Sequence, residues 1–355
     1  MKRRTYLKIG AATGATMGIA GCLGGDDDNG DDVGDDDDNG AADPDFPTDN
    51  LTWMIPWGEG GGTDQYARQI APQMEDPLGV SIEIDNREGA GSLVGTEWLA
   101  NQDPDGYTFG TANSPGWEFT WRANQDAVGD WHPEDLEPIS YAGFFGYTLI
   151  VNDAYGIEDY GELRDAYQDG DITGFGYQGA GSDSHLTTLI LREDYGLEYD
   201  TAVPYDGGGP TMEAVISDEV AAGFATNTSA VAAEESGEAT AIVNLMDVDI
   251  SDAFPGIDSI TNYGDSLAWI TEFGQYQFAP PGTDRDLRET ISAAVGEGVN
   301  SDDVQGWAEE TGNIVEYGDV DEAEDRLTGV VDEIESQVDD AVGGFDEFLA
   351  LAEED

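Results

Sequence analysis

The chain has 355 residues, enough for two domains of ordinary size, and 77 acidic residues against 12 basic ones give it a formal net charge of -65. Hydrophobic residues make up 39% of the chain, too many for a wholly disordered acidic chain, so we expect a folded protein with an acidic surface. This charge argues against binding to nucleic acids or anionic membranes through charge.

The basic residues are concentrated at the start of the chain. Four of the twelve lie at positions 2, 3, 4 and 8, which leaves eight, all arginines, for everything after Cys22. Self-repulsion between so many carboxylates destabilises a compact state unless molar salt reduces the Debye length to about 3 Å. The composition resembles that of proteins from extreme halophiles.

Residues 1–22 have the order of an export signal. A basic start is followed by a weakly apolar run too short to span a bilayer and by small residues before Cys22. The segment Arg3 to Lys8 resembles a twin-arginine export motif, and Ile19 to Cys22 resembles a lipobox. Cys22 is the only cysteine, which excludes a disulfide framework and a CxxC site. We predict that Cys22 carries a lipid; the alternative is an incidental thiol near a cleaved signal.

Residues 23–48 consist mainly of Asp, Gly and Asn. Such a run repels itself and buries nothing, so we interpret it as an acidic tether between the anchor and the folded body. Calcium binding by these aspartates is an alternative, but they have no EF-hand register.

A glycine-rich loop follows the first expected strand, Leu51 to Ile55. After the loop, apolar residues at three-to-four-residue spacing from Tyr66 to Met74 predict a helix, with Thr63 or Asp64 as its N-cap. The three glycines at 60–62 leave backbone N–H groups uncovered, so this loop and the helix N-terminus form a possible anion site. The alternative is a turn that merely allows close helix packing. Neither a P-loop nor a G-x-G-x-x-G motif is present.

Further strands and helices alternate along the chain. A strand is expected at 80–84, a helix at Leu93 to Asn101 and a strand at Tyr107 to Thr111. Alternating β and α units predict a parallel sheet with ligand loops at the carboxyl ends of its strands. The glycine loop lies at one such end, and Asn113 to Pro115 lies at another.

The same arrangement recurs at Val203 to Tyr205, which is a short strand followed by a glycine turn at 206–209. Pro210 suits the first turn of a helix. Two such helix N-termini facing a cleft hold a dicarboxylate through backbone hydrogen bonds and dipoles, without salt bridges. Glu59 and Asp206 place acids beside these proposed anion sites.

Catalysis finds little support in the sequence. Ser182, Asp183 and His185 suggest a hydrolase triad, but adjacency in sequence does not make a triad, and no G-x-S-x-G motif is present. With only His132 and His185 and no HExxH motif, a catalytic zinc site is not expected. We predict no catalytic residue, no metal and no cofactor, with His185 capping or packing at a helix start.

Several blocks resemble one family, the tripartite tricarboxylate transporter receptors, which are TctC or Bug-type extracytoplasmic solute-binding proteins. They are residues 56–64, 85–91, 103–108, 131–139, 179–186, 203–210 and 278–283. Their order and spacing match as well, and together they cover nearly all of residues 50–330. The family usually has lysine at the position of Asp206 and a small residue near Glu59.

The resemblance implies an α/β, two-lobed type II periplasmic-binding-protein fold with a ligand cleft between the lobes. Lobe 1 would comprise 49–145 plus 276–355, and lobe 2 would comprise 146–275. The resemblance also assigns the residues that pinch a ligand carboxylate: Gly60, Gly61, Gly62, Thr63, Asp64, Tyr205, Gly207 and Gly208. Looser candidates for the distal end of the ligand are Ser114, Ser182 and Asn227.

The terminal segment has a helical pattern of its own. Leu327, Val331, Ile334 and Val338 predict an amphipathic helix, whose apolar surface Phe345, Phe348 and Leu349 extend. We expect this surface to pack on lobe 1, and the alternative is a docking site for a membrane partner.

The resemblance implies a receptor anchored by lipid at the outer face of the cell membrane. It would capture a small organic acid, such as a di- or tricarboxylate, and deliver it to the membrane permease subunits of the transporter. Three alternatives remain open: a sensory binding protein coupled to a signalling membrane protein, an enzyme on the same scaffold, and a structural surface protein. Asn50 and Asn227 begin glycosylation sequons.

Overall fold

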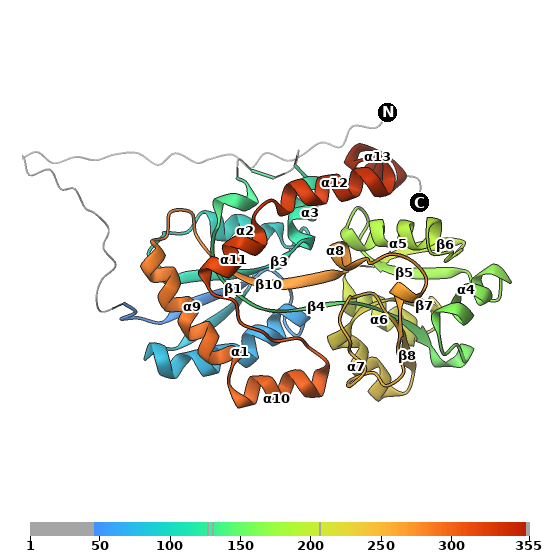
Figure 1. Cartoon of the computed structure of the whole chain (residues 1–355), viewed down its shortest axis with the longest axis horizontal. Helices are drawn as coiled ribbons and strands as arrows, with labels where there is room; N and C mark the ends of the chain where they lie inside the picture. The colour runs from blue at the N-terminus through green and yellow to red at the C-terminus, as the bar shows by residue number, and fades with distance from the viewer. Residues whose placement is uncertain (1–45, 126–127, 130, 206, 353–355) are drawn as a thin grey trace, which may run out of the picture. The chain divides into compact units, whose positions relative to one another are not determined.

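A computed structural model describes residues 46–125, 128–129, 131–205 and 207–352. The expected signal, the lipidation at Cys22 and almost all of the 23–48 tether lie outside the described residues, as does Asp206. Ten strands form one mixed sheet, in which eight follow the order β2-β1-β3-β10-β4-β7-β5-β6 while β8 pairs with β4 and β9 (Figure 1). We call the elements at 46–146 and 272–352 the first half, and those at 147–271 the second half.

The first strand has the bounds that the sequence predicts, and the next two begin two residues and one residue later than predicted. β1 (Leu51–Ile55) pairs in parallel with β2 (Ile82–Asn86) and β3 (Thr108–Ser114). β10 (Glu272–Ala279) and the start of β4 (Glu137–Asn152) then pair antiparallel, so the sheet is mixed rather than wholly parallel.

Helices cover both faces of these strands. Alternate residues of a strand point to opposite faces, and in β1 Trp53 packs in the cluster that contains α1 (Gly62–Leu78) and α9 (Arg285–Val299). Its neighbour Met54 packs in a second cluster with residues of α2, α3 and α11. Burial on both faces explains why β1 is a continuous apolar run in the sequence, as is typical of strands in a parallel region of a sheet. The other helices here are α2 (Leu93–Ala100), α3 (Gly116–Ala123), α10 (Asp302–Thr311) and α11 (Val320–Leu327).

The long strand β4 carries the chain from the first half into the second. Its first part pairs with β10, and from Tyr147 onward it pairs with β7 (Ala222–Thr226) and β8 (Ala239–Asn244). The chain returns to the first half at Glu272, four residues before position 276, because β10 pairs with β4 from Glu272 and with β3 from Gly274. Figure 1 shows β4 and β10 running between the two groups of elements.

The second half is again a sheet with helices on both faces. β5 (Gly174–Gln178) pairs in parallel with β6 (Thr201–Tyr205) and β7, and β8 pairs with β9 (Asp258–Ser259). One face packs on α4 (Tyr160–Gln168) and α5 (Asp183–Glu193), and the other on α6 (Gly208–Ile216) and α7 (Asn227–Ser236). The remaining short helices are α8 (Ala268–Thr271) and three 3-10 turns, Pro133–Asp135, Asp153–Tyr155 and Ile260–Asn262.

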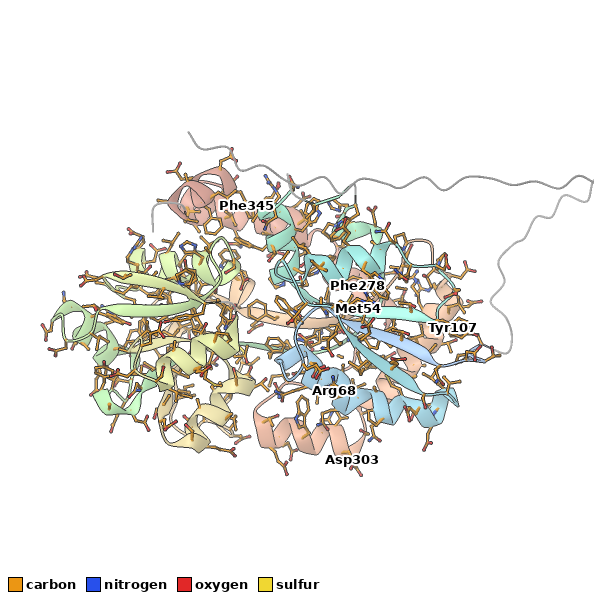
Figure 2. The ribbon with its side chains drawn as sticks, turned by 180° about the vertical axis from the view of Figure 1, so that it is seen from behind. Met54, Arg68, Tyr107, Phe278, Asp303 and Phe345 are labelled. Carbon is orange, nitrogen blue, oxygen red and sulfur yellow. The ribbon has the colours of Figure 1, made fainter. Side chains whose placement is uncertain are left out.

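The expected terminal helix is two helices. α11 ends at Leu327, and Gly329, at φ 80°, is the N-cap of α12 (Val330–Val342), so Leu327 lies outside the helix that carries Ile334 and Val338. A third helix, α13 (Phe345–Ala352), follows. Figures 1 and 2 show α12 and α13 beside α3, and α13 reaches α5 as well, because the ring of Phe348 contacts Phe119 of α3 and His185 of α5.

Two features of the described residues concern membrane spanning and metal binding. No helix in 46–352, apart from the few positions without a described placement, is both long and apolar enough to cross a membrane. Nor does any group of three His, Cys, Asp or Glu side chains in the same residues have an arrangement that would hold a metal ion.

Candidate functional site

The first glycine loop connects β1 to α1, and the helix begins earlier than the sequence suggested. Gly61 is the N-cap and Gly62 the first helical residue, because the Gly61 carbonyl already accepts a hydrogen bond from the Gln65 N–H at 2.9 Å. The expectation that Thr63 or Asp64 caps the helix is therefore wrong by two to three residues. Gly60 has φ 81°, a conformation that suits glycine.

Asp64 holds this loop in place. Its carboxylate accepts hydrogen bonds from the Gly60 N–H at 2.7 Å, Arg68 Nε at 2.8 Å and Asn86 Nδ2 at 2.9 Å. Burial alone raises the pKa of this carboxyl, but the hydrogen bonds from Arg68, Gly60 and Asn86 outweigh it and lower the pKa below its ordinary value. The Asp64 side chain is saturated by the protein, so it positions the loop.

Asn113, at the end of β3, brings an unused hydrogen-bond donor to the loop. Its Oδ1 accepts from Trp57 Nε1 at 2.7 Å and Thr63 Oγ1 at 2.9 Å; since the indole N–H only donates, the amide oxygen must face it. Asn113 is 4% exposed, yet its Nδ2 has no hydrogen-bond partner among the described residues. An unsatisfied buried donor costs about 1–3 kcal/mol, which an acceptor on a ligand would recover.

The second glycine loop is built in a similar way. β6 ends at Tyr205, Gly207 is the N-cap at φ 117°, and α6 begins at Gly208. Gln178, at the end of the neighbouring strand β5, is a second amide whose Nε2 lacks a partner in the described part of the chain. A Cβ at position 208 would lie 3.2 Å from that Nε2, so glycine is what allows the amide to lie against the loop. The Tyr205 hydroxyl donates to Glu219 at 3.2 Å.

The sequence placed Asn113 at a strand end with Ser114 and Pro115 but did not select it as a site residue, and it did not single out Gln178. The nearest prediction was Ser114, one residue beyond Asn113, and consecutive strand residues point to opposite faces. Ser114 is 6% exposed and hydrogen-bonds the Glu118 carboxyl. The sequence does show an amide residue next to a strand end and near a glycine loop, which could have marked these two residues. Whether the amide N–H has a hydrogen-bond partner depends on the tertiary structure.

The Ser182 segment forms the start of α5. Ser182 is the N-cap, and its hydroxyl donates to the carbonyls of Gln178 or Gly179 while accepting from the His185 N–H. Nδ1 of His185 accepts from the Gly181 N–H at 3.1 Å, so this nitrogen carries no proton for a carboxylate to orient. These roles agree with the expectation that His185 packs at a helix start. The role that they give Ser182 is that of the N-cap of α5.

Asn227 has a role different from the expected one. It is fully buried, its Oδ1 accepts from the Gly146 N–H at 3.0 Å, and its Nδ2 donates to the Gly312 carbonyl at 2.6 Å. Its neighbour Thr228 bonds Asn313. Asn227 therefore fastens α7 to the first half, and we leave it out of the candidate site.

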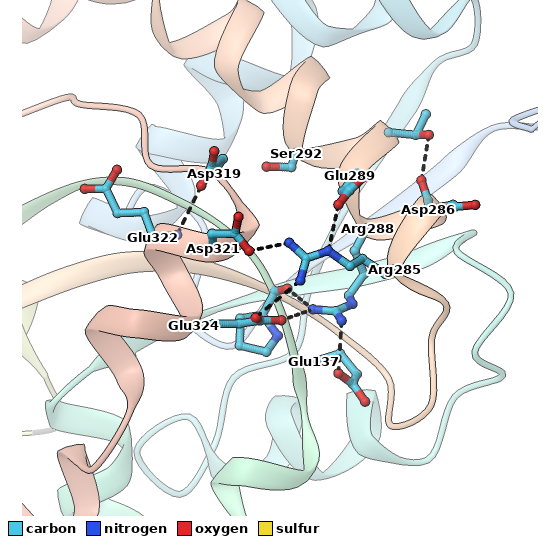
Figure 3. A network of polar contacts seen from close by, with 12 residues as sticks. Glu137, Arg285, Asp286, Arg288, Glu289, Ser292, Asp319, Asp321, Glu322 and Glu324 are labelled. Carbon is cyan, nitrogen blue, oxygen red and sulfur yellow. Dashed lines mark hydrogen bonds and ion pairs between the residues drawn. The ribbon is translucent and has the colours of Figure 1, made fainter.

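Arginines contribute little to this region, because carboxylates already hold them. Seven of the eight described arginines form ion pairs; they are Arg68, Arg87, Arg122, Arg192, Arg285, Arg288 and Arg326. Figure 3 shows Arg285 and Arg288 among carboxylates of α9, α11 and β4. Arg68 is the one that adjoins a glycine loop, and Asp64 pairs with it at 2.8 Å. Glu59 is exposed.

Comparison with known proteins supplies the family. The model described as "Tripartite tricarboxylate transporter family receptor" matches residues 66–319. A UPF0065 protein of Bordetella pertussis is 30% identical over 251 residues, covering 70% of this chain and 76% of that protein. BugT of the same organism is 25% identical over 258 residues, covering 72% and 78%.

Solved structures agree in fold. The periplasmic binding protein BugD superposes with a TM-score of 0.72 at 20% identity, over 84% of this chain and 99% of that one. MatC from Rhodopseudomonas palustris with bound malate gives 0.66 at 24% identity, over 87% and 99%. Rpa4515 of R. palustris with adipate gives 0.72 at 21% identity, over 83% and 98%.

The fold is thus that of the two-lobed, type II periplasmic solute-binding proteins, with glycine loops at helix starts in both halves. The chain belongs to the tripartite tricarboxylate transporter receptor family. This is a family of extracytoplasmic binding proteins that act as substrate receptors rather than as enzymes.

Proposed function

We propose that this protein is a receptor that captures a small carboxylate between its two halves and delivers it to the membrane permease subunits of a tripartite tricarboxylate transporter. The observation that carries the proposal is the pair of buried amide donors, Asn113 and Gln178. Each lacks a partner among the described residues and lies beside a glycine loop of its own half. Malate and adipate in two proteins of the same fold support a carboxylate as the ligand class.

The recognition would rely on neutral donors. Backbone N–H groups at a helix N-terminus, together with the helix dipole, favour an anion without any cationic side chain. The proposed contact set is Asn113 and Gln178 with the glycine-loop residues Gly60, Gly61, Gly62, Thr63, Tyr205, Gly207 and Gly208. Asp64 holds the first loop and Ser182 caps α5, so both act on the site through other residues.

The two halves would be the lobes that close on the ligand. β4 and the return into β10 are the two chain crossings between them, and a ligand that bonds to both lobes favours the closed state. If the lobes are these halves, the boundaries proposed from the sequence shift by one residue at the first crossing and by four residues at the return crossing. The permease would then recognise the closed form.

The first 48 residues would secure the receptor outside the cell. We propose twin-arginine export of residues 1–22, lipid attachment at Cys22 and an acidic tether to the folded body, with folding adapted to molar salt. Intact-mass measurement of the protein purified from its membranes tests this part: a diacylated Cys22 supports it, and an unmodified or differently cleaved chain contradicts it.

Ligand binding is tested with Asn113→Asp, which keeps the oxygen that Trp57 and Thr63 bond but replaces the free donor by a charged acceptor. Loss of a hydrogen bond to a charged group costs about 1.5–3 kcal/mol, so we expect affinity for a bound dicarboxylate to fall at least tenfold in calorimetric titration in molar KCl. Asn101→Asp adds the same charge at an exposed position on the far end of α2 and serves as the control. Equal affinities for the two variants would contradict the proposed site.

A further inference from the structure

Trp57 lies in the first glycine loop, and its side chain reaches across to the end of β3. The indole Nε1 donates a hydrogen bond to Asn113 Oδ1 at 2.7 Å. Trp57 is 36% exposed, so its N–H could have bonded water, and burial of the indole does not force this contact. The hydrogen bond therefore has its main consequence for Asn113, which is buried.

The backbone of Trp57 is fixed by the neighbouring strand β2. Asn86, the last residue of β2, donates from Nδ2 to the Trp57 carbonyl at 2.9 Å. The same Nδ2 donates to the Asp64 carboxylate at 2.9 Å, so the loop and the first turn of α1 share this anchor. Trp57 thus connects the carboxyl ends of β2 and β3, the two strands that flank β1. A residue held at both its backbone and its side chain can orient the group that it contacts.

The two donors to Asn113 Oδ1 differ in their chemistry. Thr63 Oγ1 donates to this oxygen at 2.9 Å, but a hydroxyl can donate or accept, so Thr63 could also bond an inverted amide. The indole N–H of Trp57 can only donate. Trp57 is therefore the partner that opposes inversion, because an inverted amide would direct its own NH₂ group at the indole N–H.

We propose that Trp57 is a positioning residue that makes the site selective for anions, by holding the Asn113 amide with its donor Nδ2 toward the ligand. This inference rests on the proposed carboxylate-receptor function. Nδ2 is the atom of this amide that has no partner among the described residues. An inverted amide would present its oxygen, which repels a carboxylate and attracts groups that donate, such as hydroxyl or ammonium. A neutral amide can thus distinguish the sign of a ligand's charge because Trp57 fixes its orientation.

Trp57→Phe keeps an aromatic ring in the loop and removes the N–H. Asn113 could then adopt both orientations, and the affinity would fall in proportion to the fraction of molecules with Nδ2 toward the ligand. Two equal populations would halve the affinity. The inverted state should be the larger one, because it pairs the amide NH₂ with Thr63, and buried unpaired N–H groups are rarer than unpaired carbonyls. We therefore expect the affinity for a carboxylate to fall about three- to tenfold.

The test uses the full chain in molar KCl and a panel of mono-, di- and tricarboxylates, by calorimetric titration, and continues with the acid that binds most tightly. Trp57→Phe is made in the natural chain and in Asn113→Ala, which alone should lower the affinity at least tenfold. A residue that acts through the Asn113 amide has no effect once the amide is gone, whereas one that only packs the loop has the same effect in both chains. We expect a change of less than about 1.5-fold in the Asn113→Ala chain. Where binding is weak, the rise in melting temperature at higher ligand concentration gives the Kd.

Trp98→Phe is the control, because Trp98 is also only partly buried but its ring stacks on the Arg87 guanidinium at 3.7 Å. It should leave the affinity unchanged, and melting curves establish that all variants are folded. Unchanged affinity in Trp57→Phe, or an equal loss in the Asn113→Ala chain, would overturn the role of Trp57 alone. Absence of binding for every carboxylate of the panel, or no effect of Asn113→Ala, would overturn the proposed carboxylate site as well.

Discussion

Glu118 gives the stability of this protein a specific dependence on pH. It lies in the first turn of α3, is 3% exposed, and its Oε2 has no hydrogen-bond partner in the described residues. Burial raises its pKa from 4.5 to about 8, and the hydrogen bonds from its own backbone N–H and from Ser114 oppose the shift only in part. The folded protein therefore keeps a proton that the unfolded chain releases above pH 4.5.

The sign and the size of the pH dependence of the free energy of unfolding follow from this difference in bound protons. Between pH 4.5 and 8 the unfolded state binds fewer protons, so the free energy of unfolding falls as pH rises, by about 1.4 kcal/mol per pH unit and about 5 kcal/mol in all. Glu118→Gln keeps the shape and the partner Ser114 but removes the titration. We expect this variant to be more stable than the natural chain by about 3 kcal/mol at pH 7, with the difference vanishing near pH 4.5.

Urea unfolding in a fixed concentration of molar KCl, at intervals from pH 5 to 9, measures the difference. Other carboxylates titrate in both proteins and cancel in the comparison. Glu309→Gln, at an exposed position on α10, is the control for loss of one negative charge. If the curves of the natural chain and Glu118→Gln run parallel over this range, the buried, protonated carboxyl inferred here is refuted.

Three further predictions concern the packing around the site. Phe348→Ala removes a fully buried ring that contacts Phe119 and His185, one from each half, and should cost about 3–5 kcal/mol and weaken ligand binding. Phe345→Ala removes a ring whose aromatic and cation–π contacts are with Phe119 and Arg122 of α3, and it should destabilise without that loss of affinity. Asp64→Asn should lower the free energy of unfolding by about 1.5–3 kcal/mol in urea melts above pH 4. The difference between the two proteins should disappear as pH falls through the lowered pKa of Asp64, because protonation then removes the same charge from the natural chain. Arg288→Met breaks ion pairs in which the arginine side chain is 8% exposed, and it should cost about 3–5 kcal/mol even in molar salt. Arg285→Met removes an arginine that is 43% exposed and should cost much less in molar salt; equal costs would contradict this assignment of buried and exposed pairs.

Local pattern predicted much of the fold. The apolar run Leu51 to Ile55 and the spacing from Tyr66 to Met74 are a strand and a helix in the structure. The terminal apolar pattern was read as one helix because its spacing continues across Gly329, and only the left-handed backbone there divides it. The antiparallel placement of β10 depends on partners at least 126 residues away in sequence, which periodicity does not report.

Prediction of the site was also limited by contacts between residues that lie far apart in the sequence. The glycine loops are visible in the sequence because their backbone requirement is local. Asn227 was assigned to the ligand although its amide is used by Gly146 and by Gly312, which lies 85 residues away. Asn113 was placed at a strand end but not selected as a site residue, because its free donor arises only once Trp57 and Thr63 have bonded its oxygen.

The charge of the chain explains why such donors matter. A protein with a net charge of -65 has few cations, and seven of its eight described arginines are held by its own carboxylates. A site built on arginine would lose its free cation to the surrounding acids, whereas amide groups and helix dipoles keep their orientation because the backbone fixes them. Fixed neutral donors would therefore allow an acidic protein to hold an anion without a cationic side chain.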